Sequence, residues 1–229
     1  MNKTVVEKHF DEVARDYDYY KNKNSFYYEN LKKLLGELIP KNSNVLEFGC
    51  GTGDLLNHLR PKYGYGYDIS REMISISNSK FLISKNLIFS TQLPILKSSI
   101  YNLNSNRFDY IFMSDVIEHL ENPEETFQKI SELMDKYTVF INTMANPIWE
   151  PILMIAEKLG LKMPEGPHKR ITNYEFKILI EKAGMKIVKH NYRLLMPLEI
   201  PFLTNFINKY LEKPLKKLSF IEYFVAKKQ

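Results

Sequence analysis

The sequence has a single cysteine and no long apolar run, and these absences exclude several classes of protein. Cys50 has no partner with which to form a disulfide within the chain, so a disulfide-stabilised extracellular scaffold is excluded. Met1 is followed by Asn2, Lys3 and Thr4 rather than by the apolar segment of a signal peptide. The longest apolar stretches are interrupted well short of the roughly 20 residues that cross a bilayer. We therefore expect a cytoplasmic protein without a transmembrane helix.

Glycine is also scarce, with 9 residues in 229, while hydrophobic (44%) and charged (26%) residues are balanced as in an ordinary globular protein. A chain of this length is expected to form one domain, residues 1–229, with a sizeable core. The net charge of +5 is spread along the sequence. Five lysines nevertheless gather near the C-terminus: Lys213, Lys216, Lys217, Lys227 and Lys228. They indicate a solvated surface or, alternatively, contact with an anionic partner such as RNA or a lipid head group.

Hydrophobic periodicity predicts two helices before the first strand, which we interpret as a helical cap over residues 1–40. Thr4 and Glu7 have the spacing of a capping box, and a second helix begins at Ser25. From Val45 to about residue 143 short apolar strands alternate with helices, and residues 144–229 add helices and two closing strands. This order predicts an α/β fold with a doubly wound, mostly parallel, seven-stranded, Rossmann-like sheet.

The most informative segment is VLEFGCGTGDLL, in which Gly49, Gly51 and Gly53 lie between a strand and a helix. Glycines in such a turn let backbone N–H groups approach a ligand at the start of the helix. A dinucleotide-binding turn would have its third glycine one position later, where Asp54 stands. The next strand ends at Asp68, whose carboxylate can accept hydrogen bonds from both ribose hydroxyls. The pattern predicts a nucleoside ligand; the alternative is a tight turn in which Asp68 only caps the following helix.

The EFGCGTG segment resembles the first motif of the class I S-adenosylmethionine-dependent methyltransferases, and the resemblance extends over most of the chain. It implies S-adenosylmethionine as the cofactor, with residues 41–143 as the cofactor-binding core. It also implies that Glu47 lies near the methionine amine. Residues 49–53, including Cys50, would line the methionine and the ribose, which Asp68 would hold, and Ile69 would pack on the adenine.

The usual partner of the adenine amine in this family, an aspartate shortly before an LP pair, is missing from this chain. The sequence reads FSTQLP, so Thr91 or Gln92 stands in its place. In the prediction of the cofactor site, Gln92 takes this role.

A second cluster follows a later strand in FDYIFMSDVIEHL, which matches the fourth motif of the same family. It places Ser114 beside the cofactor and Asp115, Glu118 and His119 at the mouth of the sheet, where spacings of three and four residues share a helical face. His119 or a carboxylate is a candidate general base that removes a hydroxyl proton. A purely structural role for Glu118 and His119 is the alternative.

The same DxxEH pattern also fits a divalent cation such as Mg²⁺, Mn²⁺ or Zn²⁺, held by Asp115, Glu118 and His119. It is similar to the ExxEH of ubiquinone-pathway and small-RNA 2′-O-methyltransferases, with aspartate in place of the first glutamate. Downstream, EGPHKRITNYEF resembles a segment of the quinone-methylating branch and makes His168 a candidate catalytic residue.

The acceptor pocket in this family is built from the N-terminal helices and the later inserts, which are rich in aromatic residues and methionine here. We predict a methyltransferase acting on a small molecule, on oxygen: a quinone, phenol, sugar or lipid precursor. A small-RNA 2′-O-methyltransferase and a non-catalytic cofactor-binding scaffold are the alternatives, and nucleic acid is the less favoured partner.

The apolar stretch from Leu194 to Phe206 is broken by Pro197 and Pro201, so we expect an irregular cover there. The lysines that follow it raise the alternative of a peripheral membrane contact. The sequence leaves the methylated atom and the oligomeric state open.

Overall fold

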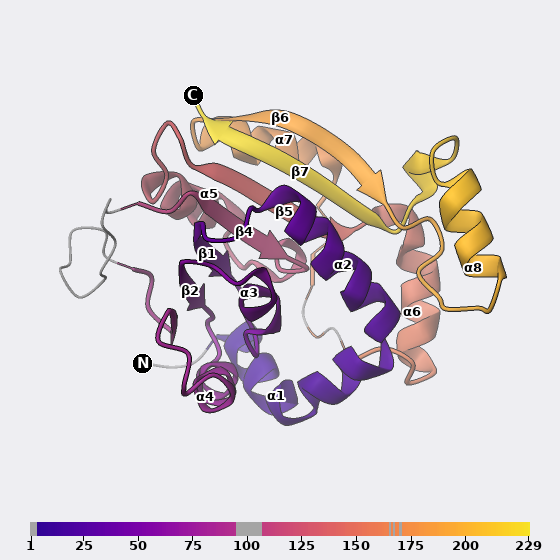
Figure 1. The fold of residues 1–229 in the computed structure, drawn as a ribbon, viewed down its shortest axis with the longest axis horizontal. Coiled ribbons are helices and arrows are strands. Elements are labelled where there is room, and N and C mark those ends of the chain that lie inside the picture. Colours follow the sequence, from indigo (N-terminus) through magenta and orange to yellow (C-terminus); the bar gives the residue numbers. More distant parts are fainter. Residues whose placement is uncertain (1–3, 95–106, 165, 167, 170) are drawn as a thin grey trace.

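A seven-stranded sheet forms the centre of the described part of the chain (Figure 1). The computed structural model describes residues 4–94, 107–164, 166, 168–169 and 171–229. The strands are β1 (Asn44–Phe48), β2 (Tyr63–Tyr67), β3 (Leu87–Ser90), β4 (Tyr110–Ser114), β5 (Val139–Ala145), β6 (Met185–Arg193) and β7 (Ile221–Lys228). Their order is β3-β2-β1-β4-β5-β7-β6. The first five positions pair in parallel, whereas β7 is antiparallel to both β5 and β6. The predicted mostly parallel, Rossmann-like sheet is confirmed.

Helices cover both faces of this sheet (Figure 1). The α-helices are α1 (Val5–Lys23), α2 (Ser25–Leu38), α3 (Asp54–Leu59), α4 (Arg71–Lys80), α5 (Pro123–Glu132), α6 (Glu150–Lys158), α7 (Asn173–Lys182) and α8 (Leu203–Phe206). Shorter turns are η1 (Ile117–His119), η2 (Pro147–Trp149), the π-helical η3 (Ile207–Leu211) and η4 (Lys216–Leu218). Apolar residues of α2 and α3 pack on one face, and those of α5 and α7 pack on the other. Within the described residues, no helix is long and apolar enough to cross a membrane.

Side-chain caps fix where several helices begin. Thr4 Oγ1 accepts the backbone N–H of Glu7 at 3.1 Å at the start of α1, and Asn122 caps α5 in the same way. At α7 the capping box is complete, because Thr172 and Glu175 each accept the backbone N–H of the other. The cap of α1 stands at Thr4, where the sequence predicted a helix start.

The segment after β6 is more regular than predicted. Pro197 and Pro201 do break it, but the chain turns into α8 directly after the second proline and continues through η3. The Thr204 hydroxyl accepts the Ile200 N–H at 2.8 Å and donates to the Leu198 carbonyl at 2.5 Å. One hydroxyl thus satisfies backbone groups of the proline-containing turn, and a helix can begin beyond it.

Candidate cofactor and acceptor site

A cavity of about 270 Å³ lies at the carboxyl edge of the parallel strands, under α1. This edge is where open α/β sheets bind their ligands. Seven of the predicted site residues line the cavity: Gly49, Gly51, Asp68, Ile69, Ser114, Asp115 and His119. The inner side of α1 supplies Phe10 and Tyr17. The cavity therefore joins the glycine loop to the turn after β4.

The glycine loop has a backbone conformation that favours glycine. Gly49, Gly51 and Gly53 have φ angles of 77°, 49° and 80°. A Cβ atom on Gly49 would lie 2.4 Å from Val116, and one on Gly51 would lie 3.1 Å from the Tyr17 ring. Both the backbone and the space around it explain the GxGxG pattern.

Asp68 connects this loop to the end of β2. Its carboxylate accepts the N–H groups of Gly51 at 2.7 Å and Ser70 at 2.9 Å. Burial raises the pKa of Asp68 to about 6, and the two N–H donors act in the opposite direction. The Ser70 hydroxyl, rather than Asp68, caps α4 by accepting the Met73 N–H at 3.1 Å. The carboxylate thus stands at the wall of the cavity, where the ribose-binding role was predicted.

The buried residues Glu47, at the end of β1, and Cys50, within the loop, are not part of the described lining of the cavity. Glu47 is 2% exposed, and its Oε2 accepts the Leu56 N–H at 3.1 Å. Burial raises the pKa of Glu47 to about 8, while the charge of Lys21 and the Leu56 N–H lower it. Burial also raises the pKa of the Cys50 thiol. Gly53 also lies outside the described lining, and a Cβ atom at this position would lie 2.6 Å from the Phe89 ring.

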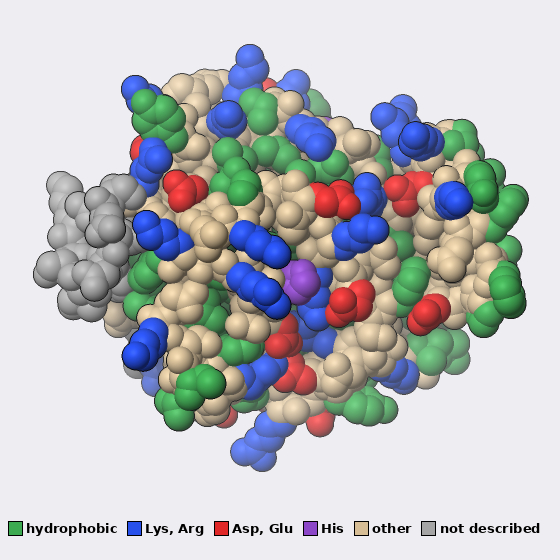
Figure 2. All heavy atoms as spheres, in the orientation of Figure 1, with side chains coloured by type: hydrophobic (Ala, Val, Ile, Leu, Met, Phe, Trp, Pro, Cys, Tyr) green, Lys and Arg blue, Asp and Glu red, His purple; other side chains and the backbone are tan. Residues whose placement is uncertain are grey.

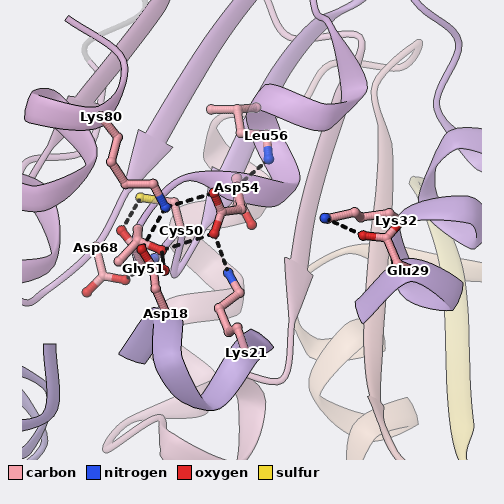
Figure 3. A network of polar contacts seen from close by, with 12 residues as sticks. Asp18, Lys21, Glu29, Lys32, Cys50, Gly51, Asp54, Leu56, Asp68 and Lys80 are labelled. Atoms are coloured by element: carbon pink, nitrogen blue, oxygen red, sulfur yellow. Dashed lines mark hydrogen bonds and ion pairs between the residues drawn. The ribbon is translucent and has the colours of Figure 1, made fainter. Parts of the chain in front are cut away.

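Helix α1 contributes a charged network that the sequence analysis missed (Figure 3). Asp18 accepts the Thr52 hydroxyl at 2.6 Å and the Lys80 ammonium at 2.8 Å. Lys80 also reaches Asp54 at 2.8 Å, and Asp54 lies 3.3 Å from the Lys21 ammonium. These contacts hold α1 against the loop between β1 and α3. The charged residues of the segment FDEVARDYDYYK can be read from the sequence, but their partners in this network lie far along the chain and could not be predicted from it.

Lys21, a further cation of this network, lies between two tyrosine rings of α1 and α2. Its side chain is 11% exposed and its ammonium lies 5.2 Å and 5.1 Å from the ring centroids of Tyr17 and Tyr28. The same charge lowers the pKa of Glu47. Lys21 is partly buried and lies outside the described lining of the main cavity.

The turn after β4 presents Asp115 to the cavity in the left-handed backbone region, with φ of 53°. Its Oδ2 accepts the Tyr27 hydroxyl of α2 at 2.6 Å. Its Oδ1 is buried and has no hydrogen-bond partner among the described residues. Burial and the charge of Glu118 raise the pKa of Asp115 to about 7, although the Tyr27 hydrogen bond lowers it. A raised pKa and a buried oxygen without a hydrogen-bond partner among the described residues make Asp115 a candidate proton acceptor.

The metal site predicted from Asp115, Glu118 and His119 is not assembled in this structure. Among the described residues, no group of three or more His, Cys, Asp or Glu side chains is arranged to hold a metal ion. The physical reason is that residues 117–119 form a single 3₁₀ turn instead of the expected α-helix. Asp115 turns toward Tyr27, and the His119 ring packs edge-on against Phe10 at 5.1 Å.

Glu118 and His168 line a second, smaller cavity of about 40 Å³. His168 Nε2 lies 3.3 Å from Glu150 Oε1, and the Lys169 N–H donates to the Glu118 carbonyl at 2.7 Å. Neither Glu118 nor His168 belongs to the described lining of the main cavity. Residues 165, 167 and 170 of the predicted EGPHKR segment lie outside the described residues.

Gln92 also lies outside the described lining of the main cavity. Its side chain is exposed, and its backbone carbonyl accepts the Tyr65 hydroxyl at 2.7 Å. Its predicted contact with the adenine amine stays a prediction.

The fold and the loop define the class I methyltransferase architecture, and the chain belongs to the methyltransferase domain family, whose model matches residues 19–190. It is 32% identical over 107 residues to the phosphoethanolamine N-methyltransferase of Plasmodium falciparum, covering 44% of this chain and 39% of that protein. It is 29% identical over 158 residues to the mitochondrial ubiquinone biosynthesis O-methyltransferase of Dictyostelium discoideum, covering 59% and 49%. The matches thus span less than two thirds of the length of these relatives. The predicted family is confirmed.

Solved structures support the same architecture. The magnesium protoporphyrin IX methyltransferase of Synechocystis, with bound S-adenosylhomocysteine, matches with a TM-score of 0.65 at 15% identity over 100% of both chains. The N-methyltransferase NodS of Bradyrhizobium japonicum matches with a TM-score of 0.64 at 14% identity, covering 98% of this chain and 99% of its own. At these identities the similarity shows the fold.

Proposed function

We propose that the chain is an S-adenosylmethionine-dependent methyltransferase that methylates a small-molecule acceptor held at Asp115. The observation that carries this proposal is that the glycine loop, Asp68 and Asp115 line one and the same cavity. Membership of the methyltransferase family supports it, as does the S-adenosylhomocysteine bound in the similar Synechocystis structure. A lining that combines apolar side chains such as Phe10 and Ile69 with polar ones such as Asp68 and Asp115 also suits a small-molecule ligand.

On the cofactor side, each end of the ligand has a residue suited to it. Asp68 would accept the ribose hydroxyls, and Ile69, which is 38% exposed in the cavity wall, would pack on the adenine. At the methionine end, Glu47 would face the ammonium and Lys21 the carboxylate. Residues 41–143 would thus provide most of the cofactor site, and α1 would cover it.

On the acceptor side, the protein has to align the nucleophile, exclude water and remove a proton, because S-adenosylmethionine supplies an already activated methyl group. Asp115 Oδ1 is the buried oxygen that is open for this proton, and Tyr27 holds Oδ2 in place. A hydroxyl acceptor would lose its proton to Asp115 as the new C–O bond forms and the C–S bond breaks. We therefore favour oxygen, although an amine would bind the same carboxylate and the relatives include both N- and O-methyltransferases.

The test is methyl transfer from labelled cofactor to small-molecule extract fractions by the wild type, Asp115→Asn and the exposed control Asp16→Asn. Loss of a general base is expected to lower kcat by about 100-fold or more, with S-adenosylhomocysteine affinity unchanged. The control should keep the wild-type rate. A fully active Asp115→Asn would refute the acceptor role. Label recovered only in RNA would instead support the 2′-O-methyltransferase alternative, and cofactor binding without transfer would support the scaffold.

A further inference from the structure

Exposed apolar side chains are concentrated in two segments of the described structure. Six large ones lie between residues 148 and 161, around α6, and nine lie between residues 198 and 218, around α8. They are Ile148, Ile152, Met154, Ile155, Leu159, Leu161, Leu198, Ile200, Phe202, Leu203, Phe206, Tyr210, Leu211, Leu215 and Leu218. We call residues 148–161 and 198–218 the α6–α8 surface. A concentration of this kind on a folded protein marks an interaction site.

The two segments are joined in the structure. Trp149 Nε1 donates to the Leu218 carbonyl at 2.8 Å, and Asn146 Nδ2 donates to the Lys217 carbonyl at 2.9 Å. The Trp149 ring also packs edge-on against Phe220 at 5.5 Å. Figure 1 shows α6 and α8 at the same end of the molecule, beyond the sheet. The α6–α8 surface is therefore one structural unit.

Phe202 is the most exposed aromatic side chain of this surface. It is 91% exposed, and with φ of 63° and ψ of −43° it is the central residue of a strained γ-turn, in which the Leu203 N–H donates to the Pro201 carbonyl at 2.7 Å. The rings of Phe206 and Tyr210 pack against each other, with centroids 5.2 Å apart. The Phe202 ring itself is almost entirely exposed to water. The geometry indicates an anchor for an apolar phase.

Lysines border the apolar side chains. Residues 198–218 contain Lys209, Lys213, Lys216 and Lys217 against two glutamates. One of those glutamates, Glu212, accepts a hydrogen bond from the Leu194 N–H at 2.9 Å. Figure 2 shows hydrophobic side chains along the margin where α8 lies in Figure 1, with lysine or arginine side chains next to them. The positive border belongs to residues 198–218, whose four lysines and two glutamates give a net charge of +2, whereas residues 148–161 contain Glu150, Glu157 and Lys158.

We propose that the α6–α8 surface docks on the head-group region of an anionic lipid bilayer. Segments that lie in the membrane interface combine leucine, phenylalanine and lysine in this manner, with the lysines reaching the anionic head groups. Protein–protein interfaces are depleted in lysine, which makes a protein partner the weaker fit. On the basis of the proposed function, docking would hold the enzyme at a membrane that contains an amphiphilic acceptor.

Co-sedimentation of the full chain with vesicles of phosphatidylcholine, with and without phosphatidylserine, tests the proposal. The wild type should bind the phosphatidylserine vesicles and be released by salt. Phe202→Ser with Phe206→Ser should lower the partition coefficient by about 10- to 100-fold, on the scale of an exposed phenylalanine becoming buried. Lys216→Glu with Lys217→Glu should remove the preference for phosphatidylserine.

A matched control exists at the turn between α4 and β3. Ile83 is 92% exposed there and Lys85 is exposed beside it, so Ile83→Ser with Lys85→Glu removes a similar pair of groups outside the surface. This control should bind vesicles as the wild type does. Thermal unfolding shows that each variant folds, and S-adenosylhomocysteine binding tests the proposed function separately.

Three outcomes would overturn the proposal. The wild type could remain in the supernatant with both kinds of vesicle, or the phenylalanine variant could bind as strongly as the Ile83→Ser, Lys85→Glu control. A concentration-dependent dimer that the phenylalanine variant abolishes, without vesicle binding, would assign the surface to a second copy of the chain.

Discussion

Replacing Glu47 by glutamine tests whether a buried acid loses its proton when the cofactor binds. Burial raises the pKa of Glu47 to about 8. At about pH 7 the protonated acid then predominates. The family resemblance places the methionine ammonium of the cofactor beside this side chain, and a neighbouring cation favours the ionised carboxylate. Binding of S-adenosylhomocysteine is therefore expected to release protons, at most one per site.

Calorimetry in buffers of different ionisation enthalpy measures this release, because the observed heat changes in proportion to the protons taken up by the buffer. Glu47→Gln should remove most of the buffer dependence, while the amide oxygen can still accept the Leu56 N–H that the carboxylate accepts at 3.1 Å. The lost charge should weaken binding by about 1.5 to 3 kcal/mol, or roughly 10- to 150-fold.

Glu132→Gln, at an exposed position on α5, is the control and should keep both the affinity and the proton release. Equal binding heats in every buffer for the wild type would refute the placement of the ammonium at Glu47.

The raised pKa of Glu47 also predicts how the free energy of unfolding depends on pH. The folded chain holds this proton between the ordinary pKa of 4.5 and about 8, where the unfolded chain has lost it. The free energy of unfolding is therefore expected to fall with rising pH across this range, and less so in Glu47→Gln.

Three other substitutions test the loop and the charges around it. Gly49→Ala is expected to lower the free energy of unfolding by about 2 to 4 kcal/mol, because φ is 77° and the new Cβ would lie 2.4 Å from Val116. Gly160→Ala, with positive φ and open space, is expected to cost about 1 kcal/mol; urea unfolding compares the two, and equal losses would contradict the steric argument. Asp68→Ala should weaken S-adenosylhomocysteine binding by about 1 to 3 kcal/mol in calorimetry, and an unchanged affinity would exclude the ribose contact. Lys21→Met should raise the Kd about tenfold at low salt, and a Kd equal to that of the wild type would show that the carboxylate is held elsewhere.

The order of the elements could be predicted because each element has a local signal. Strands such as VLEF are short and apolar, and Thr4 and Glu7 mark a helix start three residues apart. The helix after Pro201 was missed because proline is a signal against helix, whereas the Thr204 hydroxyl that closes the preceding turn has no sequence signature of its own.

The site was predictable only where its geometry is local. The GxGxG turn and Asp68 belong to adjacent elements, so their spacing was sufficient. The α1 network was missed because Asp18 lies 34 residues from Thr52 and 62 from Lys80. The proposed metal ligands assumed α-helical spacing after Asp115, and the positive φ and the 3₁₀ turn could not be read from the sequence.

The place of β7 in the sheet has a consequence for how the chain folds. β7 is the last strand in sequence but lies between β5 and β6, so β6 joins the sheet only through it. Until β7 has been synthesised, β5 presents an open edge of apolar residues and β6 has no strand to pair with. Closure of this half of the sheet requires contacts of long sequence separation, which form slowly. A ribosome-bound or truncated chain that stops before residue 221 is therefore expected to expose an aggregation-prone edge.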